Sequence, residues 1–230
     1  MKPSPDAYFA SVAVVGFDVD ETLLDEACSL RSRWKQTLQK FAHLSKDLED
    51  TFLRIFDSKG HKYQTHLQDT FDELRMPDVA PEPLVDYFRT TMGTEHTYPY
   101  VQASVLALKQ RAIRVGVITD GRQDYQEARL KRAGLFELFD FFYYGDVYQK
   151  PNPAFFRMCI QDERIQPHEL LYIGDHIARD IEGALMVGAK AIWISHESTQ
   201  PCPEGALQFK TMYDFYQWLT SDTVVKDSLL

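Results

Sequence analysis

The stretch VAVVGFDVDETLLDE at residues 12–26 decides the fold class of this chain. Its first part, residues 12–19, is β-branched and almost continuously apolar, which is typical of a parallel strand buried on both faces. The same pattern predicts further strands at 113–119, 170–173 and 189–195. Helical patterns fall between these strands, at 101–110, 123–133, 154–161 and 177–187. Strands that alternate with helices in this way predict a three-layer α/β fold built on a parallel sheet.

The segment 27–97 breaks this alternation, because it holds no convincing strand pattern. Its apolar residues recur at helical spacing, as in Trp34, Leu38 and Phe41. We therefore expect an all-helical domain at 27–97, inserted into an α/β core domain made of residues 1–26 and 98–230. The last apolar stretch, 206–219, predicts an edge strand followed by an amphipathic helix, and the residues after it are expected to fray.

The charge balance limits the partners of the chain. Among 230 residues, 34 are Asp or Glu and 25 are Lys or Arg, which gives a net charge of −9 at pH 7. An acidic surface repels phosphate backbones and anionic membranes, so we expect neither a nucleic-acid polymer nor a membrane as a partner. Hydrophobic residues make up 44% of the chain and charged residues 26%, which indicates a folded globular chain rather than a disordered one.

The amino-terminal region raises the question of a secretion signal. Residues 7–17 are apolar enough to resemble the core of a signal peptide, but Asp6 and two prolines precede them and acidic residues follow. We therefore interpret 7–17 as a buried strand and expect a cytoplasmic protein. The three cysteines lie far apart and match neither a metal site nor a disulfide framework, so free thiols are expected.

Reactive side chains gather where the predicted parallel strands end. In open α/β sheets, binding sites form outside the carboxyl ends of the strands. Four segments bring such groups to this edge: Asp18 and Asp20, then Thr119, Asp120 and Gly121, then Lys150, and finally Asp175. A hydrophobic core gives no reason to collect so many charges, and the sequence therefore predicts a functional site at this edge.

The carboxylates at this edge fit a magnesium site. Asp18 and Asp20 would repel each other unless a cation or a proton intervenes. Magnesium prefers oxygen ligands from carboxylates, backbone carbonyls and water. Asp18 and Asp175 are the expected direct ligands of Mg²⁺, and Asp180 is expected to bind through water or to orient the other ligands.

The same groups fit the transfer of a phosphoryl group. An Asp carboxylate can attack phosphorus and form an aspartyl-phosphate, and the rigid strand end makes Asp18 the candidate. Asp20 can serve as the acid for the leaving oxygen and as the base for the hydrolytic water. Thr119 offers a hydroxyl group and Lys150 a positive charge to a phosphate. The turn at 120–121 offers backbone N–H groups to the same phosphate.

Four motifs, in order along the chain, resemble those of the haloacid dehalogenase-like (HAD) superfamily. They are FDVDET at 17–22, ITDG at 118–121, KPNP at 150–153 and GDHIARD at 174–180. The resemblance extends over residues 12–194, and the helical insertion lies where this family carries a type 1 cap. It implies a three-layer Rossmann-like core with an inserted helical cap. The second acid of the first motif, Asp20, implies the phosphatase branch of the family.

The resemblance also implies a role for each acidic residue of the motifs. Asp18 would be the nucleophile and a magnesium ligand. Asp20 would be the general acid and base, and would bind magnesium through its backbone carbonyl. Asp175 would be a further magnesium ligand, and Asp180 would support the metal site.

For the phosphate, the resemblance implies binding by Thr119 and Lys150. Asp120 stands where the family more usually has Asn, and its carboxylate would weaken phosphate binding unless Arg122 or solvent neutralises it. Arg122 is expected either to contact the phosphate or to pair with a neighbouring carboxylate, Asp120 or Asp124.

These expectations define a function and its alternatives. We expect a magnesium-dependent phosphatase that acts on a small phosphorylated metabolite, such as a nucleotide monophosphate, a sugar phosphate or phosphoglycolate, and that works as a monomer or a homodimer. One alternative is a phosphomutase of the same fold, which returns the phosphoryl group to a bound sugar. Another is a non-catalytic regulator that keeps the fold to bind a metabolite.

Overall fold

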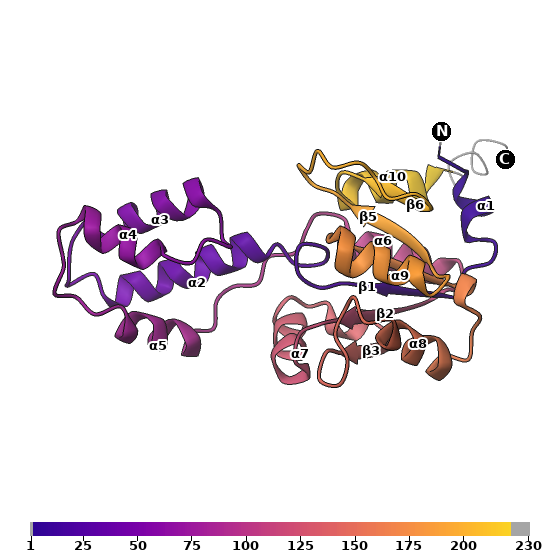
Figure 1. Ribbon diagram of the computed structural model, residues 1–230, viewed down its shortest axis with the longest axis horizontal. Coiled ribbons are helices and arrows are strands. Elements are labelled where there is room, and N and C mark those ends of the chain that lie inside the picture. The colour runs from indigo at the N-terminus through magenta and orange to yellow at the C-terminus, as the bar shows by residue number, and fades with distance from the viewer. Residues whose placement is uncertain (1, 222–230) are drawn as a thin grey trace. The chain divides into compact units, whose positions relative to one another are not determined.

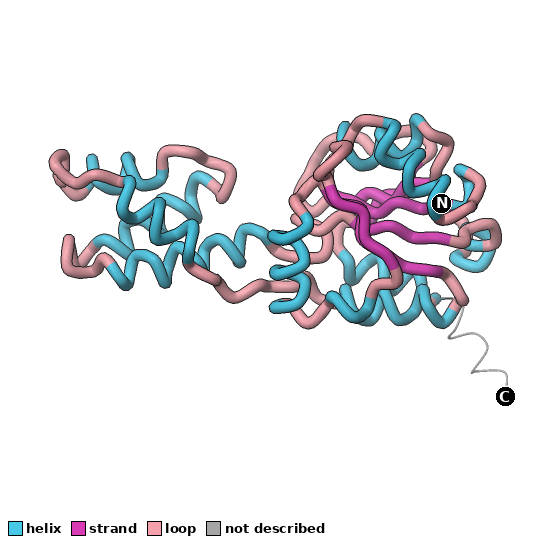
Figure 2. Tube along the Cα trace, turned by 90° about the horizontal axis from the view of Figure 1, so that it is seen from below, coloured by secondary structure: helices cyan, strands magenta, loops and turns pink. Residues whose placement is uncertain are grey.

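A computed structural model of the protein describes residues 2–221. These residues divide into two compact units, one made of residues 2–24 and 97–221 and the other of residues 25–96. The first unit contains a six-stranded sheet in which neighbouring strands all run parallel, in the order β3-β2-β1-β4-β5-β6. Figure 1 labels its elements, and Figure 2 shows its strands side by side with helices around them.

The strand that carries the first motif lies in the middle of this sheet. The strands are β1 (Val14–Phe17), β2 (Arg114–Thr119), β3 (Phe141–Tyr144), β4 (Leu170–Gly174), β5 (Lys190–Ile194) and β6 (Ala206–Phe209). Val15 of β1 is in register with Val115 of β2 on one side and with Leu171 of β4 on the other. Because the three strands are parallel and in register, the residues that follow them meet at one edge.

Helices cover both faces of the sheet. On one face, α1 (Pro5–Phe9), α6 (Val101–Gln110), α7 (Gln123–Arg132) and α10 (Met212–Leu219) pack against the sheet. On the other face lie α8 (Pro153–Asp162) and α9 (Glu182–Met186). The side chains of β1 alternate between these two cores, with Val15 in the first and Val14 in the second. The predicted three-layer α/β fold is therefore confirmed.

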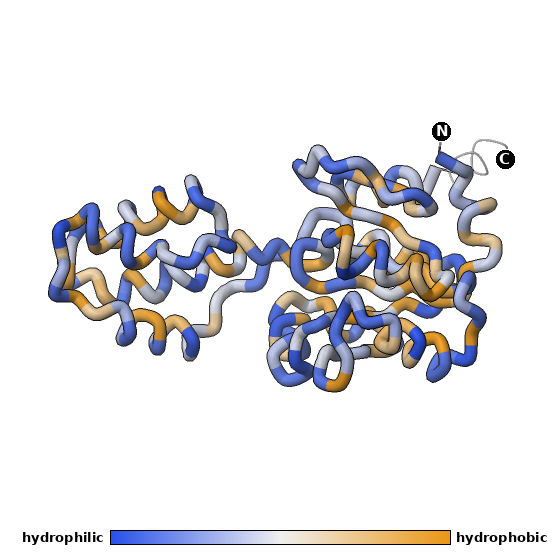
Figure 3. Tube along the Cα trace, in the orientation of Figure 1, coloured by the Kyte–Doolittle hydropathy of each residue, from blue (hydrophilic) through white to orange (hydrophobic). Residues whose placement is uncertain are grey.

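The second unit is built from helices. These are α2 (Glu26–Lys40), α3 (Leu48–Lys59), α4 (His66–Glu73) and α5 (Glu82–Thr90). Leu38, Phe52 and Leu84 are buried in a core of their own, and Figure 3 shows apolar and polar residues alternating along these helices. The prediction of helices for the inserted segment is confirmed, whereas its predicted role as a cap stays a prediction.

The predicted strands and helices correspond to the observed ones, with three exceptions. The strand predicted at 7–17 is wrong at its start, because Ser4 caps α1 and Pro5 occupies its first position, a combination that favours a helix. The strand β3 was not predicted. The helix predicted at 177–187 begins instead as a π-helical turn, η3 (Ile177–Ile181), before α9 continues it.

Two other expectations concern the ends of the chain and membranes. The expected fraying after 219 falls mostly outside the described residues. Within residues 2–221, we find no helix that is both long enough and apolar enough to cross a membrane.

Candidate active site

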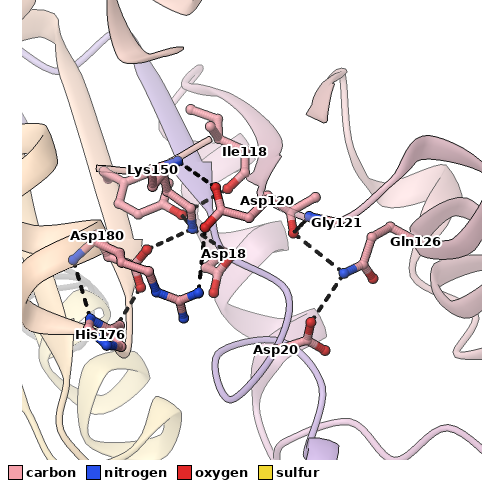
Figure 4. Close-up of polar contacts among 12 residues, drawn as sticks. Asp18, Asp20, Ile118, Asp120, Gly121, Gln126, Lys150, His176 and Asp180 are labelled. Carbon is pink, nitrogen blue, oxygen red and sulfur yellow. Dashed lines mark hydrogen bonds and ion pairs between the residues drawn. The ribbon is translucent and has the colours of Figure 1, made fainter. Parts of the chain in front are cut away.

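Lys150 lies at the centre of a buried group of charges at the carboxyl edge of the sheet. Its Nζ donates hydrogen bonds to Asp18 Oδ1 at 2.8 Å, to Asp180 Oδ1 at 2.7 Å and to the Tyr172 hydroxyl at 2.7 Å. Only 1% of the Lys150 side chain is exposed. Figure 4 shows the ammonium group between the two carboxylates. All three hydrogen atoms of the ammonium group thus have acceptors.

These neighbours keep Lys150 charged although it is buried. Burial alone would lower the pKa of Lys150, but the carboxylates of Asp18 and Asp180 raise it above its ordinary value. Burial also raises the pKa of the Tyr172 hydroxyl well above its ordinary value, so this group keeps its proton. Tyr172 donates that proton to the backbone carbonyl of Ile118 at 2.8 Å. The ammonium group is therefore fixed from three sides.

Asp18 is held in place by the sheet, and its ionised carboxylate would be stabilised by a cation. Its backbone N–H donates to the carbonyl of Ile173, which extends the pairing of β1 with β4. Burial raises the pKa of Asp18 well above its ordinary value, Lys150 opposes this shift, and the carboxylates of Asp180 and Asp175 add to it. A further positive charge beside Asp18 would favour its ionised form.

Three carboxylates lie close enough together to bind one cation between them. Asp18, Asp175 and Asp180 each offer an oxygen, and these oxygens all lie within 4.8 Å of one another. Carboxylate oxygens are the ligands that a hard divalent cation takes. The donor set and its surplus of negative charge therefore fit a magnesium ion, and these residues could hold one.

The local backbone explains the place of Asp180. One of its carboxylate oxygens, Oδ2, accepts a hydrogen bond from the backbone N–H of His176 at 2.9 Å. Gly174 lies against the same side chain, and a Cβ atom at Gly174 would lie 2.6 Å from Asp180 Oδ2. The glycine of the GDHIARD motif is thus required for close packing of the second acid of that motif.

Asp20 lies in a separate set of contacts. Its carboxylate forms an ion pair with Arg129 and accepts a hydrogen bond from Gln126 Nε2 at 3.1 Å. The same Gln126 nitrogen lies 3.5 Å from the Thr119 hydroxyl. Figure 4 shows the side chain of Gln126 directed toward Asp20. Asp20 is 33% exposed and Arg129 only 3%. Helix α7 therefore anchors both Asp20 and Thr119.

The remaining predicted residues have different surroundings. The Thr119 hydroxyl accepts a hydrogen bond from the backbone N–H of Gly121 at 3.3 Å. Asp120 accepts a hydrogen bond from the backbone N–H of Lys150 at 2.6 Å. Arg122 forms its ion pair with Asp124 and is 76% exposed. Of the two alternatives for Arg122, the structure favours pairing with a carboxylate, and its predicted contact with phosphate stays a prediction.

Three residues of this site, Tyr172, Gln126 and Arg129, lie outside the four motifs. Tyr172 carries a hydroxyl group in an otherwise apolar strand, and this is the one feature of the sequence that could have indicated its place in the site. Gln126 and Arg129 are three residues apart in α7 and so share a face of the helix. Nothing in the sequence indicates that this face turns toward Asp20.

Comparison with known proteins assigns the family. Residues 15–194 match the model of the haloacid dehalogenase-like hydrolase family. The chain belongs to this family, as the four motifs predicted.

Its relatives include phosphatases. Glyceraldehyde 3-phosphate phosphatase of Pyrococcus furiosus is 24% identical over 195 residues, which cover 80% of this chain and 81% of that protein. Phosphoserine phosphatase of Thermus thermophilus is 30% identical over 132 residues, which cover 56% of this chain and 53% of that protein. The crystal structure of a HAD phosphatase from Thermococcus onnurineus is similar at a TM-score of 0.59 and 26% identity, over 90% of this chain and 98% of that one. The predicted class of enzyme, a phosphatase of this family, is confirmed.

Proposed function

We propose that this enzyme hydrolyses phosphate monoesters of small metabolites in two steps, with Asp18 as the group that accepts the phosphoryl group. One observation carries this proposal. The Asp18 carboxylate is fixed by Lys150 at the end of the central strand, and its oxygen lies within 4.8 Å of oxygens of Asp175 and Asp180. Asp18 is thus a rigid nucleophile beside the Lys150 ammonium group and beside carboxylates that can bind a metal. Such a nucleophile is suited to attack on an anionic phosphoryl group.

In the first step, a carboxylate oxygen of Asp18 attacks phosphorus. The bond between phosphorus and the leaving oxygen breaks, and Asp20 gives its proton to that oxygen. In the second step, Asp20 takes a proton from water, and the water oxygen attacks the phosphorus of the aspartyl-phosphate. The bond between phosphorus and Asp18 breaks, inorganic phosphate leaves, and both carboxyl groups return to their starting states.

Magnesium is the proposed cofactor. Asp18 and Asp175 would hold it with their carboxylates, and Asp20 with its backbone carbonyl. Asp180 would support the site through water, because its two carboxylate oxygens already accept hydrogen bonds from Lys150 and His176. When bound, Mg²⁺ supplies positive charge that offsets the carboxylates and polarises the phosphoryl oxygens. The Lys150 ammonium holds the Asp18 carboxylate in one orientation, because Asp180 and Tyr172 fix its other two hydrogen atoms.

The phosphoryl group would be bound by groups of the second motif. Thr119 is the last residue of β2, the strand next to β1, and the backbone N–H groups at 120–121 follow it. Sugar phosphates, nucleotide monophosphates and phosphoglycolate remain the proposed substrate class. The relatives named above, a glyceraldehyde 3-phosphate phosphatase and a phosphoserine phosphatase, support a phosphorylated substrate.

Release of inorganic phosphate from an aryl phosphate tests this function. We expect release that depends on magnesium and that falls by about a thousandfold or more in Asp18→Asn, because the nucleophile is lost. Asp162→Asn, an equivalent change at an exposed position of α8, serves as the matched control and should keep full activity. Robust release by Asp18→Asn would contradict the proposed nucleophile.

A panel of phosphorylated metabolites extends the test. Each compound is scored by kcat/KM and by its product. Free inorganic phosphate as the product supports a hydrolase, whereas an isomerised sugar phosphate supports the phosphomutase alternative. Binding of metabolites without any turnover would support the non-catalytic alternative.

A further inference from the structure

An ion pair joins the two segments that flank the proposed nucleophile. Arg179 in η3 has its Nη1 3.6 Å from Oδ2 of Asp120, the residue that follows β2. The turn η3 follows β4, and β1 with Asp18 lies between β2 and β4 in the sheet. The pair therefore connects two neighbouring strands of β1 at the carboxyl edge, where Asp18 lies.

Asp120 adds negative charge where the proposed substrate is itself negative. Its Oδ1 accepts a hydrogen bond from the Lys150 backbone N–H, so the carboxylate is held beside the Lys150 segment and does not turn away into solvent. Asp18, Asp175 and Asp180 already contribute carboxylates at this edge. A phosphate monoester that approaches Asp18 would be repelled by Asp120 unless a nearby cation offsets it.

Arg179 is suited to supply that cation. The guanidinium group of an arginine stays charged in a protein, and Nη1 of Arg179 lies 3.6 Å from Oδ2 of Asp120. Among residues 2–221, the buried Nε of Arg179 has no hydrogen-bond partner. The other candidate, Arg122, pairs with Asp124.

We propose that Arg179 is a positioning residue that offsets the charge of Asp120 and thereby sets the affinity of the site for the phosphoryl group. This inference rests on the proposed function, because it concerns the site at which the phosphoryl group would bind. It assigns Arg179 an action through Asp120 and not through direct contact with the substrate. The two actions differ in what happens when the Asp120 charge is removed.

A double-mutant cycle distinguishes action through Asp120 from direct contact with the substrate. The proteins are the wild type, Arg179→Gln, Asp120→Asn and the double variant, and Asn at 120 keeps an oxygen that accepts from the Lys150 N–H. The affinity for inorganic phosphate is measured by calorimetry in magnesium, and kcat and KM are measured with an aryl phosphate. Thermal unfolding of each variant is recorded to show that all four proteins fold.

The proposal predicts that Arg179→Gln lowers the affinity for phosphate only while Asp120 carries its charge. Arg179→Gln weakens phosphate binding about tenfold, which corresponds to ~1.4 kcal/mol, and raises KM with little change in kcat. Asp120→Asn binds phosphate as tightly as the wild type or more tightly. The double variant returns to within about twofold of the wild type, because the charge that needed compensation is gone.

Two further variants sharpen the result. Arg179→Lys keeps the positive charge and should retain most of the affinity. Arg157→Gln makes the same change of charge at an exposed position of α8 and should leave phosphate binding and KM unchanged.

An equal loss from Arg179→Gln in the wild-type and the Asp120→Asn backgrounds would overturn the proposal, since Arg179 would then act on the phosphate directly or on the fold. A wild type that neither binds phosphate nor hydrolyses the ester would contradict the proposed function itself, and this inference with it.

Discussion

The two compact units differ in what they bury. Among its described residues, the α/β unit buries four charged residues as a whole, Asp18, Arg129, Lys150 and Asp180. The helical unit buries polar side chains as well, but among its described residues these are uncharged Ser and Thr and one histidine, His66. Burial lowers the pKa of His66 below its ordinary value, which keeps it neutral near pH 7.

The difference separates a unit that carries chemistry from one that is stabilised by ordinary packing. Burying a charge costs stability unless the charge is paired, and even a paired charge is often no better than an apolar side chain. Charges that serve only the fold are therefore not expected in a core. Their concentration at the carboxyl edge of the sheet, and their absence from the described core of the helical unit, indicate that the edge is kept for a reaction.

The largest effect on stability is expected from Lys150→Met. The substitution leaves the Asp18 and Asp180 carboxylates buried without their cation, and the free energy of unfolding should fall by about 3–5 kcal/mol. Urea denaturation in the absence of magnesium measures this change in the free energy of unfolding. The control is Lys131→Met, which removes an exposed ion pair with Glu127 in α7 and should cost less than about 1 kcal/mol. Equal losses in the two variants would contradict the claim that the buried charges at the carboxyl edge differ from exposed ion pairs.

In the helical unit, the largest effect is expected from a cavity. Leu38 is fully buried in its core, and Leu38→Ala should lower the free energy of unfolding by about 2–4 kcal/mol. This loss comes from packing, so it should be the same with and without magnesium. A loss that magnesium restores would mean that the core of the helical unit is not independent of the charged site.

Gly174→Ala is expected to have an intermediate effect and to disturb the site. The added Cβ would lie 2.6 Å from Asp180 Oδ2, so Asp180 must move and its contact with Lys150 is weakened. We expect a loss of about 1–3 kcal/mol in stability, together with weaker dependence of activity on magnesium. An alanine variant with wild-type activity and magnesium dependence would show that the close packing of Asp180 is unimportant.

The smallest effect is expected at the exposed ion pair of the helical unit. Arg31 Nε donates to Asp57 at 2.8 Å, and both side chains are at least 41% exposed. This hydrogen bond lowers the pKa of Asp57. The pair therefore contributes stability above the ordinary pKa of aspartate, about 3.9, and loses it as the pH falls through the lowered pKa of the folded state.

Asp57→Asn should consequently cost less than about 1 kcal/mol near pH 7 and nothing in strong acid. Thermal unfolding at several pH values and at low and high salt measures this difference. A cost above that of Gly174→Ala would contradict the contrast between exposed and buried pairs.

Much of the fold and of the site followed from the sequence because both depend on local patterns. The apolar run of β1 and the helical spacing of the insertion predict their elements directly. The motif residues 18 and 175 follow strands and residue 119 ends one, and parallel strands in register bring such residues to one edge. Lys150 is placed differently, because it lies in a turn just before the helix expected at 154–161.

The rest depends on contacts between residues far apart in the chain. Arg129 meets Asp20 and Arg179 meets Asp120 only after the sheet is assembled, and no local pattern records which way those side chains turn. The strand β3 consists of aromatic residues, FFYY, without the β-branched residues that mark β1, β2 and β5. For α1, the start signal is Ser4 followed by Pro5, which the interpretation of 7–17 as a strand leaves out.

The phosphorylated state of Asp18 tests the central claim most directly. Asp20→Asn lacks the proposed base for the second step, so a phosphorylated enzyme should accumulate when it is mixed with an aryl phosphate and magnesium and then quenched in acid. Peptide mass spectrometry should find the phosphoryl group on the peptide that contains Asp18, and should find none there when Asp18→Asn is added to the same variant. A phosphoryl group on another side chain, or steady release of phosphate without modification of Asp18, would contradict the account.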